Sequence, residues 1–406
     1  MKHKSGFLKL LLLVEVLLLI AVFVLSILGG GIRAIKQKGN ANQGNTIEKH
    51  HNVEESESQS QTEESMGDWS PELNDITFSE AVQEKMDSMT VEQKVAQLFV
   101  TSPEALTDND QVTLAGDGTR SALESSPVAG LVYGEGNFLG KTQAGTLLSN
   151  TQNMARELQG MELFLMVEER GGENHSVVAK SLNYSYAATP QSLADAEDVA
   201  EAKTQTANIA TYLKDIGINF VLGPCADLSA GVDPAYDEMT YGSETSKATA
   251  LVSEAVNGFQ EAGIKTATGT FPGRSYGDGV DVDFSTWREQ NQLVYQGAIN
   301  GNTQALVVSN QSYPALTGEE GTPCAQSQYC VAYIRNVMGY EGILMTEEVN
   351  PETAIASIRA GMNLLYCKES FKDTYQAVLD AVNNGAISEK QLDQSVGRIL
   401  TVKLAE

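Results

Sequence analysis

The sequence predicts an α/β fold, a TIM-type (β/α)8 barrel, preceded by an N-terminal transmembrane helix and a disordered stalk. Strand-length apolar runs alternate with helix-period segments from about residue 76 to the end of the 406-residue chain. Eight such runs can be counted, which favours a closed barrel over an open sheet. The first 75 residues differ sharply in composition from the rest. We therefore expect a membrane anchor with basic flanks at 1–38, an acidic stalk at 39–75 and the barrel at 76–406.

The first segment has the composition of an uncleaved membrane anchor. Leu10 to Leu28 is a 19-residue run interrupted only by Glu15 and Ser26, close to the ~20 residues that cross a bilayer. A cleaved signal peptide is the competing interpretation, but its apolar core normally has about 7–15 residues and a small-residue cleavage site, and no such site is evident here.

The charge distribution predicts the orientation of this anchor. Residues 1–38 hold six basic side chains and one acid, a net charge of +5. Because the whole chain has a net charge of −26, the remaining residues together carry −31. Basic residues flank both ends of the apolar run, so they do not decide the orientation alone. A charge of −31 would be unusual against an anionic inner leaflet. We expect a single-pass cell-membrane protein with its N-terminus inside and its barrel extracytoplasmic.

Residues 39–75 are expected to form a disordered stalk. They are rich in Ser, Gln and Glu and nearly free of large apolar side chains. Such a segment does not bury enough apolar surface to order itself. It would hold the barrel away from the membrane.

The barrel region opens with a helix at Ser79–Asp87, and the spacing of Thr90 and Gln93 is that of a capping box at the next helix. The predicted strands follow in order: Leu98–Thr101, Gly130–Tyr133, Leu163–Val167, Asn219–Leu222, Ile264–Ala267, Ala305–Val308, Gly342–Met345 and Met362–Tyr366. Helix-period segments lie between them: Gln143–Leu158, Ser192–Ile216, Ser243–Ala262, Gln326–Met338 and Glu352–Ala360. In such a barrel, function is sought at the residues that close each strand.

Composition excludes several classes of partner. A net charge of −26 argues against nucleic acid, which is bound through Lys and Arg. No metal-ligand spacing is present and no cofactor is expected. The pairing of the cysteines, which are Cys225, Cys324, Cys330 and Cys367, stays open.

Six segments, in unbroken order over residues 80–405, are each similar to a motif of one known family. They are Met89–Phe99 (an opening helix), Asn219–Leu228 (NFAPVxDV), Phe271–Gly273 (the FPG of KHFPGHGD), Thr322–Gly342 (TPASLS…LGFDG), Ala360–Asn363 (AGxD) and Ile387–Val396 (a closing helix). The chain thus resembles glycoside hydrolase family 3, in its single-domain β-N-acetylhexosaminidase branch. The resemblance implies the same barrel and a retaining mechanism with a carboxylate nucleophile and a second group as acid/base.

The two catalytic positions that the resemblance implies are both altered. Glu347 stands where the family has its nucleophilic Asp, one methylene longer, and a misplacement of ~1 Å can cost on the order of 10²-fold. Ser285 stands where the branch has the His of a D-x-H loop, and serine does not titrate near neutrality. Asp283 of that motif is kept. We take Glu347 and Asp283 as candidate catalytic residues, and the alternative is that both are ordinary solvated or paired carboxylates.

The implied sugar-binding positions are altered as well. The family's VDxEGGR strand end corresponds to Glu168 for its Asp and Arg170 for its Glu, whereas Asp227 matches outright. Arg170 and Arg274 are candidates for binding an anionic group, or else for neutralising nearby acids. The candidate substrate-binding residues are Glu168, Arg170, Asp227 and Arg274. His175 is the only His of the barrel region and is expected to be a packing or surface residue.

These substitutions together predict a degenerate active site. We expect a membrane-anchored extracytoplasmic protein that acts on or binds cell-wall or N-acetylglucosamine glycans and is catalytically impaired. A protein partner at the cell surface would fit the same role. The alternative is an active retaining β-glycosidase with Glu347 as nucleophile and a loop carboxylate as acid/base.

Overall fold

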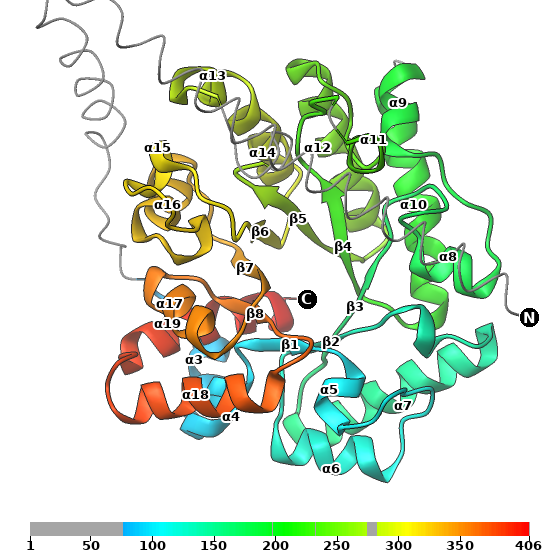
Figure 1. Ribbon diagram of the computed structural model, residues 1–406. Coiled ribbons are helices and arrows are strands. Elements are labelled where there is room, and N and C mark those ends of the chain that lie inside the picture. Colours follow the sequence, from blue (N-terminus) through cyan, green and yellow to red (C-terminus); the bar gives the residue numbers. More distant parts are fainter. Residues whose placement is uncertain (1–75, 197, 232, 274–281, 406) are drawn as a thin grey trace, which may run out of the picture. The chain divides into compact units, whose positions relative to one another are not determined.

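Eight parallel strands close into a barrel in chain order, which confirms the predicted TIM-type barrel (Figure 1). The computed structural model describes residues 76–196, 198–231, 233–273 and 282–405. The strands are β1 (Phe99–Thr101), β2 (Gly130–Val132), β3 (Phe164–Glu168), β4 (Phe220–Cys225), β5 (Lys265–Phe271), β6 (Ala305–Val308), β7 (Ile343–Glu348) and β8 (Leu364–Tyr366). Val100 of β1 pairs with Gly130 of β2 and with Tyr366 of β8, so the first strand closes the ring.

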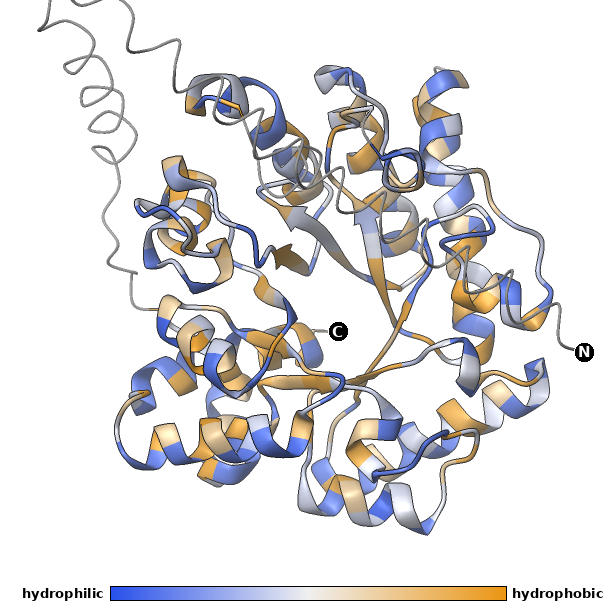
Figure 2. Cartoon of the chain, viewed as in Figure 1, coloured by the Kyte–Doolittle hydropathy of each residue, from blue (hydrophilic) through white to orange (hydrophobic). Residues whose placement is uncertain are grey.

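Helices surround this barrel. The α-helices are α3 (Glu80–Asp87), α4 (Val91–Ala96), α5 (Pro103–Thr107), α6 (Asp117–Ser125), α7 (Lys141–Gln159), α8 (Val177–Leu182), α9 (Pro190–Ala196), α10 (Val199–Ile216), α11 (Pro234–Asp237), α12 (Thr245–Glu261), α13 (Phe284–Glu289), α14 (Asn291–Asn300), α15 (Pro314–Thr317), α16 (Gln328–Ala332), α17 (Pro351–Ala360), α18 (Phe371–Asn383) and α19 (Glu389–Leu404). Short 3₁₀ segments η1 (Glu135–Asn137) and η2 (Cys324–Gln326) and a π-helical turn η3 (Tyr333–Val337) complete the order. The strands are mostly apolar and the helices carry apolar and polar residues on different faces (Figure 2).

The capping box predicted at the start of α4 is confirmed. The Thr90 hydroxyl accepts from the Gln93 amide at 3.3 Å, and the Gln93 side chain accepts from the Thr90 amide at 3.0 Å. Each contact satisfies an amide that would otherwise lack an intrahelical partner.

Two predicted helices differ from the structure. The segment Ser192–Ile216 is divided between α9 and α10, because Asp198 caps a new helix by accepting from the amides of Ala200 and Glu201. The segment Gln326–Met338 is divided between α16 and η3. The apolar periodicity continues across both interruptions. Because periodicity does not reveal a change in the hydrogen-bonding pattern, the sequence did not predict them.

The predicted anchor and stalk lie outside the described residues. Within residues 76–405, gaps excepted, none of the helices combines the length and the apolar character that a bilayer crossing requires.

A buried carboxylate ties the end of β3 to its surroundings. Glu169, which is fully buried, accepts from the Val178 amide at the start of α8 at 2.6 Å and from the Tyr212 hydroxyl of α10 at 2.8 Å. Burial raises the pKa of Glu169 above its ordinary value, against the lowering effect of these hydrogen bonds. The contact holds the strand end that carries two of the candidate site residues.

We predict that Glu169→Gln changes the pH dependence of stability. The raised pKa means that the native state holds the Glu169 proton more tightly than the unfolded chain does, so the wild-type protein loses stability as pH rises from about 4.5 through the native pKa. The variant lacks this loss. Denaturant unfolding between pH 4 and 7 should therefore show the free energy of unfolding of the variant rising relative to wild type, by at most about 1.4 kcal/mol per pH unit. A difference that is constant with pH would contradict the assignment.

Candidate functional site

The candidate residues gather at one rim of the barrel, where parallel strands present their carboxyl ends. Glu168 is the last residue of β3, Asp227 follows β4 by two positions, and Glu347 is the penultimate residue of β7. Arg274 lies outside the described residues. Glu168, Asp227 and Glu347 therefore lie at one end of the barrel, as their positions at strand ends predicted.

A large cavity opens beside the ends of β1, β2, β3 and β8. Its volume is about 1070 Å³, and Tyr133, Glu168, Tyr366 and Lys368 contribute to its wall. The wall is strongly acidic, with carboxylates from Glu104, Asp108, Asp110, Glu135, Glu168 and Glu369. Burial, with the charges of Glu348 and Glu168, raises the pKa of Tyr366 to about 12, so its hydroxyl stays protonated. Burial raises the pKa of Tyr133 as well, so the cavity offers acceptors and two neutral phenols to a ligand rich in hydroxyl donors.

Glu168 and Arg170 face one another at the end of β3. The closest approach of the Arg170 guanidinium to the Glu168 carboxylate is 3.5 Å, and their side chains are 24% and 43% exposed. Arg170 also donates to the Leu222 carbonyl of β4 at 3.0 Å and to the Met239 sulfur at 2.9 Å. The guanidinium thus offsets the charge of Glu168. Its hydrogen bond to Leu222 also joins the ends of β3 and β4.

His175 belongs to this cluster, although the sequence favoured a packing or surface residue. Its side chain is 15% exposed, and Nδ1 lies 3.9 Å from Glu168 while Nε2 lies 3.9 Å from Glu238. Within the described chain, Nε2 is buried without a hydrogen-bond partner. The imidazole is therefore close to the rim carboxylates but is not hydrogen-bonded to either.

Asp227 is held by two tyrosines. Its side chain is buried, and its two oxygens accept from the hydroxyls of Tyr236 and Tyr295. Tyr295 lies also 2.7 Å from the Thr270 carbonyl of β5. Burial and the charge of Asp227 raise the pKa of both phenols, which keeps them protonated as donors. This set links the ends of β4 and β5 to α11 and α14.

Glu347 is placed toward the end of β6. One carboxylate oxygen accepts from the Asn310 amide at 2.7 Å and from the Ser309 hydroxyl at 3.3 Å. The neighbouring Glu348 accepts from the amides of Lys368 and Glu369, at 2.7 and 3.1 Å, and thus braces the loop after β8. Glu347 is partly exposed at the rim, which is compatible with contact to a ligand.

Asp283 is the N-cap of α13. Its carboxylate accepts from the Ser285 hydroxyl at 2.6 Å, and from the hydroxyl and amide of Thr286 at 2.6 and 2.9 Å. These hydrogen bonds hold the pKa of Asp283 well below its usual range. The arrangement makes this carboxylate the cap of α13 and favours its ionised form. Ser285 serves the same cap.

An aromatic cluster fixes α13 against the barrel. Trp287 is fully buried, its indole N–H donates to the Pro272 carbonyl at 2.9 Å, and its ring stacks on Phe284 and meets the edge of Phe271. Tyr313 and Tyr333 complete the contacts of Trp287. The helix that begins at Asp283 is therefore packed and not a free loop.

The four cysteines are all buried free thiols. Burial raises the pKa of the Cys225 thiol to about 12 and that of Cys330 above its ordinary value. The sequence left the pairing of the cysteines open, and in this structure none of the four forms a disulfide.

Sequence reasoning missed the partners of the candidate residues. Tyr236 and Tyr295 lie in helices 9 and 68 positions from Asp227, and no local pattern links them to it. Asn310 reaches Glu347 through its backbone amide, which carries no side-chain signal. The cap at Asp283 did have a signal, because an Asp that precedes an apolar helical turn is a common N-terminus.

Comparison with known proteins identifies the barrel. Residues 90–402 match the Glycosyl hydrolase family 3 N terminal domain. The chain is 22% identical over 325 residues to "Beta-hexosaminidase A" of Pseudoalteromonas piscicida, covering 68% of this chain and 53% of that protein. The chain therefore spans about half the length of that curated relative.

Solved structures of family members share the fold. A β-N-acetylglucosaminidase of this family from Paenibacillus sp. superimposes with a TM-score of 0.71 at 24% identity, over 78% of this chain and 62% of that one. A β-N-acetylhexosaminidase from Beutenbergia cavernae gives 0.68 at 19% identity, over 78% of this chain and 99% of that one. With the match over residues 90–402, the chain belongs to glycosyl hydrolase family 3.

Proposed function

We propose that this protein binds glycans of the β-linked N-acetylglucosamine type at the carboxyl rim of its barrel and hydrolyses them poorly or not at all. Family membership and the names of the similar proteins support the ligand class. The observation that carries the proposed impairment is Asp283, whose carboxylate is held as a helix cap by Ser285 and Thr286. The cap leaves the position without a titratable donor for the leaving oxygen.

The alternative is an active retaining β-glycosidase with Glu347 as nucleophile. The position of Glu347 at the end of β7 favours it, because a carboxylate there reaches the same rim as Glu168 and Asp227. The proposed partner, a loop carboxylate, weakens it, since Asp283 accepts three hydrogen bonds from its own helix. We therefore favour binding over turnover.

A turnover assay on the full chain distinguishes an impaired glycan-binding protein from an active glycosidase. We expect release of chromophore from an aryl N-acetyl-β-glucosaminide to be no faster with wild type than with Glu347→Gln, because no acid/base completes the mechanism. Activity that Glu347→Gln abolishes would establish the enzyme and refute the impairment.

Binding is expected in the same preparation. Calorimetric titration with chitotriose should show a complex, and Glu168→Gln should weaken it about tenfold, because a charge-assisted hydrogen bond at the cavity is lost. Glu157→Gln on α7 is a matched control, since that carboxylate is 61% exposed and forms an ion pair with Arg120 away from the cavity. Absence of any complex, or equal weakening in the control, would contradict the ligand class or the cavity.

Ser285→His tests the missing acid/base directly. An imidazole two positions after Asp283 would restore the D-x-H pattern of the family and supply a group that titrates near pH 6.5. We expect hydrolysis of chitobiose to rise by up to about 10²-fold, with a pH profile that Ser285→Gln does not show. An unchanged rate would place the impairment in the sugar contacts instead of in proton transfer.

We further propose that residues 1–38 anchor the barrel outside the membrane, where a glycan or a protein partner of the cell surface would meet it. The 19-residue apolar run and the contrast between +5 and −31 support this. Full-length protein should stay in the membrane after alkaline carbonate washing, and protease added to intact cells should digest the barrel. Extraction by carbonate, or protection from protease, would contradict the anchor or the orientation.

A further inference from the structure

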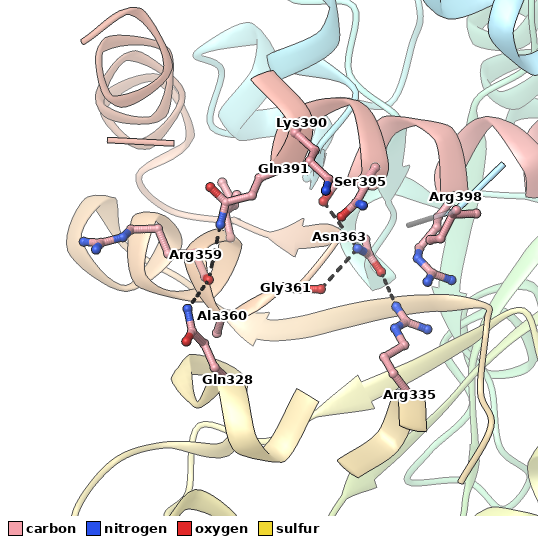
Figure 3. A pocket seen from close by; sticks show the side chains of 13 residues that line it. Gln328, Arg335, Arg359, Ala360, Gly361, Asn363, Lys390, Gln391, Ser395 and Arg398 are labelled. Carbon is pink, nitrogen blue, oxygen red and sulfur yellow. Dashed lines mark hydrogen bonds between the residues drawn. The ribbon is translucent and has the colours of Figure 1, made fainter. Parts of the chain in front are cut away.

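A second cavity lies at the opposite end of the barrel, where the strands begin. Gly361 and Asn363 precede β8 there, and the first turns of α19 and the residues of α16 and η3 close the sides (Figure 3). The cavity has a volume of about 210 Å³. Among the described residues, the charged side chains that line it are Arg335, Arg359, Lys390 and Arg398, and none of the lining side chains is a carboxylate. In a chain with 53 acidic and 27 basic side chains, such a lining is unusual.

Arg335 is the deepest of these cations. It is 6% exposed, and it donates to the carbonyls of Tyr340 and Gly342 at 2.6 and 2.8 Å. Its second nitrogen donates to the Asn363 side chain at 2.8 Å, as Figure 3 shows. All of these acceptors are neutral, and none of the ion pairs in the described chain includes Arg335. A buried guanidinium without a carboxylate carries an uncompensated charge.

A second arginine adds to that charge. Burial and the charge of Arg398 lower the pKa of Arg335 to about 9. Arg398 itself pairs with Glu341 at 2.8 Å, but Glu341 lines the adjoining cavity and is 70% exposed. The pair therefore leaves the positive field around Arg335 largely uncancelled, and a bound anion would relieve it.

Neutral donors complete the lining. The side chains of Gln328 and Gln391 both donate to the Arg359 carbonyl. One side of α19 lines the same space through Lys390, Gln391 and Arg398. Arg359 and Lys390 are exposed lining residues, and Figure 3 shows the Arg359 side chain directed away from Asn363.

We propose that this cavity binds a small tetrahedral oxyanion, free phosphate or the phosphoryl or sulfate group of a small molecule. Guanidinium and ammonium groups together with amide donors match the oxygens of such a group. The volume suits a small ligand, and the net charge of −26 disfavours a polyanion such as nucleic acid. The site is separate from the glycan rim and does not depend on the function proposed there.

Calorimetry with inorganic phosphate on the full chain tests the site. We expect saturable one-to-one binding that sodium chloride of equal ionic strength does not reproduce, with sulfate competing. Lys390→Gln with Arg398→Gln should weaken phosphate binding at least about tenfold, because two cationic lining groups are lost. The matched control is Arg120→Gln with Lys180→Gln, which removes the same net charge from exposed ion pairs elsewhere and should change affinity less than about twofold.

Asn363→Asp supplies a second, opposite test. It keeps the acceptor for Arg335 and adds a negative charge beside it, so phosphate binding should fall at least about tenfold while the variant still unfolds cooperatively. Unchanged phosphate affinity in this variant would overturn the proposal. So would an equal loss in the Arg120 and Lys180 control, or a phosphate response no larger than that to chloride.

Discussion

Closure of the parallel sheet is the constraint on which the rest of the structure depends. Because β1 is hydrogen-bonded to β2 on one side and to β8 on the other, no strand is left with an unpaired edge. Closure also sorts the chain into two rims, with every carboxyl end at one and every amino end at the other. Residues as distant as Glu168 and Glu347 meet at the first rim, and Arg335 and Asn363 meet at the second. Each rim then acquires its own charge and its own cavity.

At the carboxyl rim, two possible roles of the Asp283 carboxylate exclude one another. Asp283 can accept hydrogen bonds from the first turn of α13 or serve as a proton donor, but not both, because acceptance stabilises the ionised form. The serine at position 285 contributes to the cap, where an imidazole would have competed with it. Ser285 thus contributes to the helix start, and the impairment proposed above rests on this contact. Packing of Trp287 against Phe271 holds α13, and with it the capped Asp283, against the barrel.

Sequence alone predicted the eight strands and the cap at Thr90, because apolar runs and cap spacings are local signals. It did not predict the break before Asp198, because the apolar period runs through it. At the site, the chain positions of Glu168, Asp227 and Glu347 sufficed to place them at one rim. Their partners were beyond reach: the tyrosines around Asp227 and the Asn310 amide beside Glu347 are set by tertiary packing. The burial of His175 between two carboxylates likewise arises only in the folded chain.

The two rims show how a chain of strong overall charge can hold sites of opposite sign. Screening in physiological salt limits the reach of exposed charges to about 8 Å, so a local lining matters more than the total of −26. The carboxyl rim collects acids around an open cavity, where water compensates them. The amino rim buries Arg335 away from water, with only neutral acceptors, and there the compensation must come from the protein or from a ligand. In the described chain Glu341 forms an ion pair with Arg398, whereas the hydrogen-bond acceptors of Arg335 are neutral and the charge of Glu341 acts on it less than that of Arg398 does.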